Sequence, residues 1–242
     1  MPAEYAVPAL DKAFDVLELV AASPHPLAQN EIAEGTGRTV GQLFRVLVAL
    51  EARGWLVRDA ESGRYTLSMA AFDLAHRQPA LRGLLVAATP AMRALADGVL
   101  QSCNLSVLDM AAVRVVGQAE SPADFGYRVR VGALFPLESA TGAVLVALGD
   151  PDVRAEHLAH LDPSEAAAVE RDGLLRREDP VQPGITDVAV AIRDRLGVAR
   201  AALTVPYVAT SLSDHGIDDV VAAATAAAAR ISERIIGVGA IG

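Results

Sequence analysis

The sequence has almost none of the features of a secreted, membrane-spanning or disulfide-bonded protein. Cys103 is the single cysteine, so no internal disulfide can form, which is typical of a reducing cytoplasm. No charge-free apolar run reaches the roughly 18 residues needed to cross a bilayer, and the N-terminus lacks the basic and apolar regions of a secretory signal. We therefore expect a cytoplasmic protein without a membrane anchor, in which Cys103 is a packing residue.

The motifs of common catalytic and cofactor sites are also missing. Neither G-x-S-x-G nor a glycine-rich phosphate loop occurs. His157 and His160 have helical spacing, but no further histidine or cysteine accompanies them, so we predict a solvated helix face and no metal site. Asp187 has no partner carboxylate or base at a recognisable spacing. We predict no cofactor and no enzymatic activity, with an enzyme that converts a small molecule kept as an alternative.

Positive charge is scarce overall but unevenly distributed. The chain has 21 Lys and Arg against 30 Asp and Glu, and this balance argues against nucleic-acid binding because phosphate contacts depend on cations. Between residues 38 and 64, however, five arginines accompany only three acidic residues. A local positive patch on an acidic protein fits a module that docks on DNA through one face.

The stretch 39–55, TVGQLFRVLVALEARGW, organises the first part of the chain. Its apolar residues recur at the spacing of a helix that faces a core. Thr39 and Gln42 form a T-x-x-Q capping box at its start, and Gly54 tolerates the left-handed conformation at its end. The sequence therefore predicts a short amphipathic helix with defined ends.

The outward face of this helix admits two interpretations. Glutamine can pair with adenine, arginine with guanine, and phenylalanine can rest on a thymine methyl group. The face is then that of a DNA recognition helix, or else the solvated side of an ordinary core helix. The candidate DNA-binding residues here are Arg38, Thr39, Gly41, Gln42, Phe44 and Arg45.

The neighbouring segments favour the DNA-binding interpretation. We predict a helix over 10–22, with Leu10, Phe14, Leu17 and Ala21 on one face, and a second helix over 29–34. Strands over 55–58 and 65–68 flank a Ser62-Gly63 turn. Three helices followed by a hairpin form a winged helix-turn-helix, and Arg64 on the hairpin is expected to contact a phosphate.

The rest of the chain predicts a second domain of mixed composition. We expect a helical connector over 69–79, a helix that ends at Thr89-Pro90, and a new helix after it. Further strands are predicted over 105–108, 113–118, 127–131, 188–192 and 201–208, and further helices over 141–148, 153–171 in two pieces, and 218–236. Without regular β-α alternation, this order indicates an α+β fold around an antiparallel sheet. The expected domains are 1–68, a linker helix over 69–79, and 80–242.

In this order the segments resemble the IclR family of bacterial transcription regulators over residues 9–236. In the first domain the resemblance rests on ALDKAFDVLELV, LAQNEIAEGTG, FRVLVALEARGW and GRYTLS; in the second, on NLSVLD, AESP, RVGALFPLESATG, PGITDVAVAI and AALTV. It implies a winged helix, a linker helix, and a C-terminal ligand-sensing domain similar to GAF or PAS folds. It also implies homodimers, often paired as dimers of dimers, on palindromic double-stranded DNA operators that commonly control adjacent catabolic operons.

The chain departs from the family pattern at the DNA-binding surface. Ala28 stands where the family usually has the N-cap serine of the second helix. Val40 and Gly41 stand where a basic residue and a serine are frequent, whereas Arg45 matches the family's arginine. These departures bear on which operator sequence is read.

The resemblance places a small-molecule effector among strand residues and at the start of the helix after Ser139, Ala140, Thr141 and Gly142. Free N–H groups at a helix start attract an electron-rich group such as a carboxylate. A family cysteine falls at Asp187, serines fall at Thr204 and Pro206, and an acidic residue falls at Arg177. We expect Leu105 and Val107 to supply apolar lining.

Asp187 indicates that the expected effector also carries a hydrogen-bond donor. An ionised carboxylate only accepts hydrogen bonds, so it favours a donor on the ligand. The sequence thus indicates a small aromatic or organic acid or its amide-like derivative, unless Asp187 faces solvent or caps the backbone. A DNA-binding protein without an effector is a further alternative.

Overall fold

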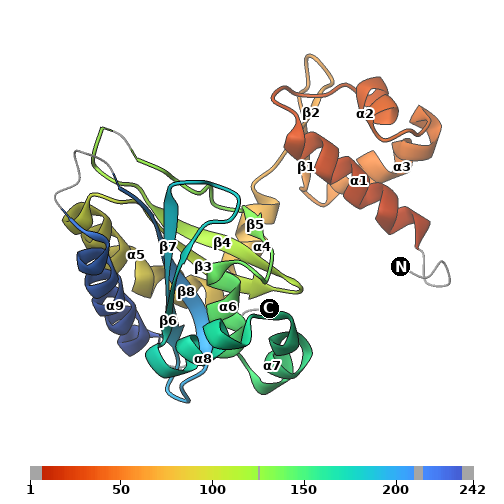
Figure 1. The fold of residues 1–242 in the computed structure, drawn as a ribbon. Helices are drawn as coiled ribbons and strands as arrows, with labels where there is room; N and C mark the ends of the chain where they lie inside the picture. Colours follow the sequence, from red (N-terminus) through yellow and green to blue (C-terminus); the bar gives the residue numbers. More distant parts are fainter. Residues whose placement is uncertain (1–6, 125, 210–214, 236–242) are drawn as a thin grey trace. The chain divides into compact units, whose positions relative to one another are not determined.

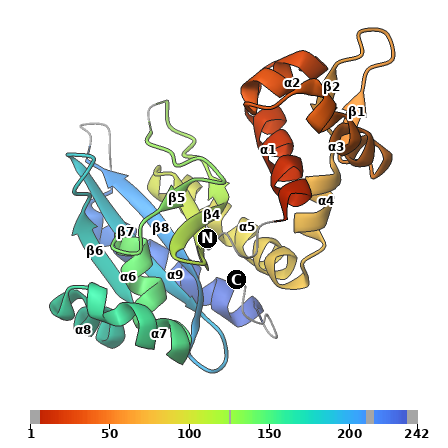
Figure 2. The ribbon, with the colours of Figure 1, turned by 90° about the vertical axis from the view of Figure 1, so that its right-hand side faces the viewer.

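The computed structural model describes residues 7–124, 126–209 and 215–235 (Figures 1 and 2). The chain divides into two compact units, Met1–Arg77 and Gln78–Gly242. Each unit has its own hydrophobic core.

The first unit is a small helical domain with a hairpin. Its elements are α1 (Pro8–Ala22), α2 (Gln29–Gly35), α3 (Val40–Ala52), β1 (Leu56–Arg58), β2 (Tyr65–Leu67) and α4 (Ala70–His76). The strands pair in antiparallel register, and Leu27 adds a bridge to Tyr65. Leu43, Leu47 and Leu50 of α3 are buried as the apolar spacing predicts. The winged helix-turn-helix arrangement is therefore present.

The face that α1 buries is centred on residues other than the apolar set noted in the sequence. Leu10 is 53% and Phe14 is 58% exposed, whereas Val16 and Val20 are buried. The helix carries apolar residues on more than one side, so its spacing alone does not decide which stripe faces inward. Packing against α3 and β2 selects the stripe of Val16 and Val20.

The second unit is built on a six-stranded antiparallel sheet in the order β5-β4-β3-β8-β7-β6. Its strands are β3 (Cys103–Asp109), β4 (Ala112–Ala119), β5 (Leu134–Phe135), β6 (Leu174–Glu178), β7 (Ile185–Arg193) and β8 (Ala199–Val208). Because side chains alternate along each strand, the central strands contribute to a core on both faces of the sheet.

Helices cover the two faces unequally. One face carries α5 (Pro79–Val99) and α9 (Ile217–Arg234) (Figure 1). The opposite face carries the fully buried α6 (Ala140–Ala147), and α7 (Pro151–His157), the 3₁₀ turn Leu158–His160 and α8 (Pro163–Asp172) follow it. The predicted α+β class is confirmed. The predicted end of the last helix at Ile236 lies outside the described residues.

The helix break predicted at Thr89-Pro90 is wrong, because α5 runs through Pro90. A proline inside a helix costs about 3 kcal/mol. Buried side chains such as Leu84, Ala88, Met92 and Leu95 continue at helical spacing on both sides of it, and each large one contributes about 1.5–3 kcal/mol. Packing therefore outweighs the lost hydrogen bond.

Two strand predictions also need correction. Tyr127–Val131 lies outside the sheet despite its alternating pattern, and the edge strand is the short β5. The strand β6 was not predicted, because its sequence LLRRE reads as a charged continuation of the preceding helix. It forms because Gly173 adopts a left-handed φ of 74° and ends α8, after which β6 pairs with β7.

Candidate functional site

The start of α3 is held by a reciprocal pair of hydrogen bonds. Thr39 Oγ1 accepts from the Gln42 backbone N–H at 3.4 Å, and the Thr39 N–H donates to Gln42 Oε1 at 3.0 Å. This is the predicted capping box. It engages the carboxamide oxygen of Gln42, so a bidentate contact from this side chain to adenine would require the box to open.

The outward side of α3 is open to a large partner. Phe44 is 56% exposed, Arg45 is exposed, and the space beside Gly41 is empty for 4 Å around the position of a Cβ. Among the described residues Arg45 has no hydrogen-bond or ion-pair partner. The structure therefore places an arginine that has no partner among the described residues and an exposed ring on the outer side of the N-terminal half of a capped helix.

Arg38, by contrast, has a partner within the domain. Its guanidinium forms an ion pair with Asp15 of α1, and its side chain is only 28% exposed. This contact fixes the turn before α3 to α1. Contact between Arg38 and DNA remains a prediction, and such a contact would compete with the Arg38–Asp15 ion pair.

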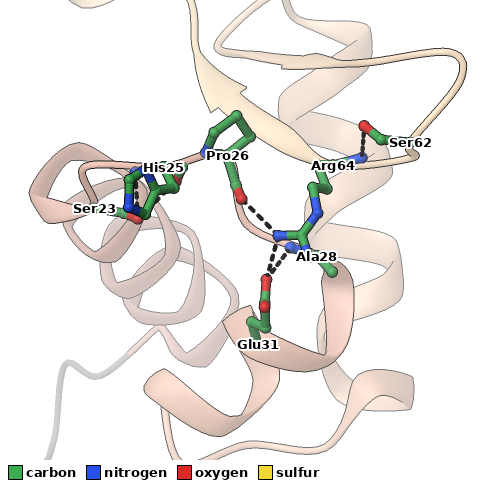
Figure 3. A network of polar contacts seen from close by, with 7 residues as sticks. All are labelled: Ser23, His25, Pro26, Ala28, Glu31, Ser62 and Arg64. Atoms are coloured by element: carbon green, nitrogen blue, oxygen red, sulfur yellow. Dashed lines mark hydrogen bonds and ion pairs between the residues drawn. The ribbon is translucent and has the colours of Figure 1, made fainter.

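Arg64 also bonds within the domain (Figure 3). Its Nη1 donates to the Pro26 carbonyl oxygen and to Glu31 Oε2, both at 2.8 Å. Glu31 Oε2 in turn accepts the Ala28 N–H at 2.7 Å. The Ala28 N–H and the Arg64 guanidinium lower the pKa of the Glu31 carboxyl below its usual value. The contact of Arg64 with phosphate remains a prediction, but the structure shows that this arginine also joins β2 to the start of α2.

The second unit contains a cavity of about 270 Å³ between α6 and the end of the sheet formed by β6, β7 and β8. Of the predicted effector residues, those that line it are Ser139, Ala140, Thr141, Arg177, Asp187, Thr204 and Pro206. Asn104, Tyr127 and Asp179, which were not predicted as site residues, line it as well.

Strand register brings these polar residues to one face of the sheet. Asn104 pairs with Thr204 across β3 and β8, and Asp187 of β7 lies between Pro206 and Arg177 on its two neighbours. Residues directly opposite each other point to the same side. The cavity is therefore assembled from residues as far apart in the chain as Asn104 and Pro206.

Leu105 and Val107, which were predicted to supply apolar lining, do not line this cavity. Both are buried in the core on the other face of the sheet, with α5 and α9. A shift of one residue along a strand moves a side chain to the opposite face, and Asn104 is the residue of β3 that reaches the cavity.

Gly142 is next to the cavity but does not line it. Its N–H donates to Ser139 Oγ at 3.1 Å, which caps α6. A Cβ at this position would lie 2.2 Å from the Leu137 carbonyl oxygen. Gly142 therefore permits the close approach of the preceding turn, whereas Ala140 and Thr141 present the first turn of α6 to the cavity.

Negative charge dominates the electrostatics of the cavity. The pKa of Asp187 is raised to about 6, mainly by burial and also by the charge of nearby Asp179, while Arg177 opposes the shift. Burial and the charges of Asp179 and Asp187 also raise the pKa of Tyr127. Asp187 is thus a partly buried carboxyl that titrates near neutrality.

The inner wall of the cavity holds neutral polar groups. Thr141 Oγ1 and Thr204 Oγ1 are 2.8 Å apart, and both residues are buried. Asn104 is 5% exposed, and its Oδ1 accepts from Ser106 Oγ at 3.2 Å. Among the described residues, the Nδ2 group of Asn104 donates no hydrogen bond. The wall therefore has hydrogen-bond donors available for a ligand.

Other possible sites receive no support from the described residues. They contain no group of three or more His, Cys, Asp or Glu side chains that could hold a metal ion, and His157 pairs with Glu156 at 3.8 Å. No helix in the described ranges is long and apolar enough to cross a membrane. Cys103 is buried, and burial raises its pKa to about 12, so its thiol stays protonated.

Two family models cover most of the chain. One, described as the IclR helix-turn-helix domain, matches residues 9–60, and the other, described as bacterial transcriptional regulator IclR C-terminal, matches residues 79–233. The chain belongs to the IclR family. It is an IclR family transcriptional regulator, and both the predicted family and its DNA-binding domain are confirmed.

Curated relatives agree with the IclR assignment. The HTH-type transcriptional regulator BhcR of Paracoccus denitrificans (strain Pd 1222) is 28% identical over 240 residues, covering 93% of this chain and 86% of the relative. The HTH-type transcriptional regulator KdgR of Escherichia coli (strain K12) is 24% identical over 240 residues, covering 93% and 91%.

Solved IclR structures share the fold. An IclR homologue from Microbacterium hydrocarbonoxydans, complexed with 4-hydroxybenzoate, has a TM-score of 0.76 at 24% identity, covering 94% of this chain and 98% of the homologue. The Thermotoga maritima IclR has a TM-score of 0.76 at 20% identity, covering 93% and 98%. At these identities the likeness shows the fold, and the residues that contact DNA and effector remain predictions.

Proposed function

We propose that this regulator binds a palindromic operator as a homodimer or a dimer of dimers, and that a small effector changes its affinity for that operator. The observation that carries the proposal is the exposed face of α3, where Arg45, Phe44 and Gly41 stand at the start of a capped helix. A recognition helix enters the major groove with its N-terminal residues against the bases.

The dimer follows from the amount of DNA that one helix can read. One recognition helix covers too few base pairs to specify a genomic address, and a two-fold dimer reads two half-sites. The connector offers a surface for this: Met69, Phe72 and Leu74 are each more than half exposed, and α4 has no buried residue. We assign the stretch 69–85 to the contact between two copies.

The cavity of the second unit is the proposed effector site. The first turn of α6 and the wall of Asn104 suit an electron-rich end of a ligand, and Asp187 suits a donor. A small aromatic or organic acid, or its amide-like derivative, has both features. We propose that a catabolic operon beside the regulator's own gene encodes the enzymes that degrade this compound. The regulator then acts in the cytoplasm, where its DNA lies.

A binding selection tests the proposal. The full chain is incubated with a library of random duplexes, bound duplexes are recovered and sequenced over several rounds, and affinity for the enriched sequence is measured by fluorescence anisotropy. We expect an inverted repeat with half-sites one or two helical turns apart. Recovery of no common sequence, or of single half-sites alone, would contradict the proposal.

A further inference from the structure

The charged residues that line the cavity carry an excess of negative charge. Glu138, Asp179 and Asp187 are acidic, and among the described lining residues only Arg177 is a cation. The sequence favours an acid or its amide-like derivative without choosing between them. The surroundings of these four side chains allow a choice.

Arg177 is already occupied. Its Nη1 donates to Glu165 Oε2 at 2.8 Å, and its Nη2 donates to the Glu138 carbonyl oxygen at 2.5 Å. Its side chain and that of Glu165 are only about a quarter exposed. A free guanidinium fork is the usual receptor for a carboxylate. Here that fork joins β6 to α8 and to the turn before α6, and Glu165 compensates its charge.

A carboxylate ligand would therefore enter beside an excess of negative charge. Asp179 lies close enough to Asp187 for its charge to raise the pKa of the Asp187 carboxyl. A third carboxylate in the same partly buried space adds repulsion. The first turn of α6 offsets part of this cost, but a neutral carbonyl oxygen can accept the same N–H groups.

The donors and acceptors of the cavity match a neutral ligand at both ends. The Nδ2 of Asn104 has no acceptor among the described residues. In the Thr141–Thr204 pair one hydroxyl accepts from the other and retains a hydrogen of its own. These donors suit a carbonyl oxygen, whereas Asp187 suits an N–H or an ammonium group.

The apolar part of the lining suits a flat ring. Tyr127, Phe135, Pro136 and Pro206 all contribute to the wall. At about 270 Å³ the space lies just below the usual range of ligand pockets. One ring with short substituents fits such a volume.

We propose that the cavity selects a neutral or cationic aromatic ligand with a carbonyl group and an N–H donor, such as a primary amide or aminoamide, and discriminates against the free carboxylate of the same skeleton. This inference rests on the effector-binding role proposed above. It makes Asp187 the residue that determines specificity, and Arg177 a positioning residue for the wall.

Calorimetry on the full chain tests the selection with matched compounds. The pairs are benzamide with benzoate, 4-hydroxybenzamide with 4-hydroxybenzoate, and 4-aminobenzamide with 4-aminobenzoate. At pH 8 we expect each amide to bind at least ten times more tightly than its acid. As the pH falls from 8 to 5.5 we expect the acids to gain affinity, because Asp187 takes up a proton and its repulsion is lost. The other ionisable groups that line the cavity are Asp179, Glu138, Arg177 and Tyr127.

The variant Asp187→Asn removes the charge and keeps the shape. We expect it to bind the acids at least ten times more tightly at pH 8 than the unchanged chain does, and to lose their pH dependence. Asp152→Asn, in the exposed first turn of α7 away from the cavity, should bind both classes as the unchanged chain does. Thermal melting of each variant confirms that it is folded.

Acids that bind as tightly as amides to the unchanged chain at pH 8 would overturn the inference, as would a panel in which neither class binds. Failure of the proposed function has a different signature. In that case a panel member binds with the expected selectivity, but operator affinity stays the same with and without it.

Discussion

Arg64 Nη1 and Glu31 Oε2 lie 2.8 Å apart and join two segments that are 33 residues apart in the sequence (Figure 3). Both side chains are 41% exposed, and an exposed ion pair of this kind contributes little to stability because solvent screens it. The domain can therefore lose the pair without unfolding, and in the free protein Glu31 offsets the charge that Arg64 would offer to a phosphate.

This pairing gives opposite expectations for its two partners. Arg64→Ala should weaken binding similarly on operator and scrambled duplexes, and should reduce the slope of log K against log salt by about 1. Glu31→Gln should instead tighten binding several-fold on both duplexes, because it removes a negative charge near the DNA and releases Arg64. Anisotropy titrations over a range of salt concentrations measure both effects. Weaker binding by Glu31→Gln would show that the pair acts by holding the wing in place.

Base reading is assigned to Arg45 and Gln42. Arg45→Ala should weaken operator binding by about 1–3 kcal/mol and change binding to scrambled DNA much less. Gln42→Ala should cost a similar amount on the operator and should also lower stability, because the capping bond to Thr39 is lost. Arg171→Ala, which removes an arginine from α8 of the second unit, is the control and should leave operator binding unchanged.

Gln42→Glu separates the two roles of this side chain. It keeps an oxygen that can accept the Thr39 N–H, so thermal stability should not fall. It removes the amide donor, so operator affinity should fall. Operator affinity that is unchanged in Arg45→Ala and in both Gln42 variants would exclude α3 as the reading helix.

Assembly is expected to depend on α4. The unchanged chain should have the mass of a dimer or tetramer at micromolar concentration. Phe72→Asp, which places a charge on an exposed apolar side chain, should shift the mass toward the monomer. Leu196→Asp, at an 85% exposed turn position, should leave the mass unchanged. Light scattering after size-exclusion chromatography gives the masses, and a monomeric unchanged chain, with and without DNA, would contradict the assignment.

The titration of Asp187 predicts how stability varies with pH. Its pKa is raised from 3.8 to about 6 in the folded chain, so the folded state binds more protons than the unfolded state between these values. Stability should therefore fall as pH rises through this range. The shift of about two units sets a limit of about 3 kcal/mol on the effect. Asp187→Asn should melt at a higher temperature than the unchanged chain at pH 8, and the difference should vanish near pH 4. An equal difference at both pH values would exclude ionisation as its cause.

The same residue is expected to couple the ligand to DNA binding. Asp187→Ala should bind the operator as the unchanged chain does and should lose the effect of a bound amide on operator affinity. Such coupling typically amounts to 1–3 kcal/mol. Anisotropy with and without 4-aminobenzamide measures it, and a variant that keeps the full effect would place the effector elsewhere.

Local hydrogen bonding explains the features that could be predicted from the sequence. The capping box of Thr39 and Gln42, the left-handed Gly54 and the wing turn depend on residues within a few positions of one another. The buried strands β7 and β8 were recognisable because their side chains are apolar on both faces. These patterns, with the family resemblance, were sufficient for the winged helix and the α+β class.

Contacts between distant segments decided the rest. Which apolar stripe of α1 is buried depends on α3 and β2, and the passage of α5 through Pro90 depends on packing along its whole length. The choice of Asn104 over Leu105 for the cavity depends on strand register, which no local pattern reveals. The sequence by itself determined which residue types can serve the effector site. Only the tertiary structure decided their charge balance, because it placed Glu165 beside Arg177 and Asp179 near Asp187.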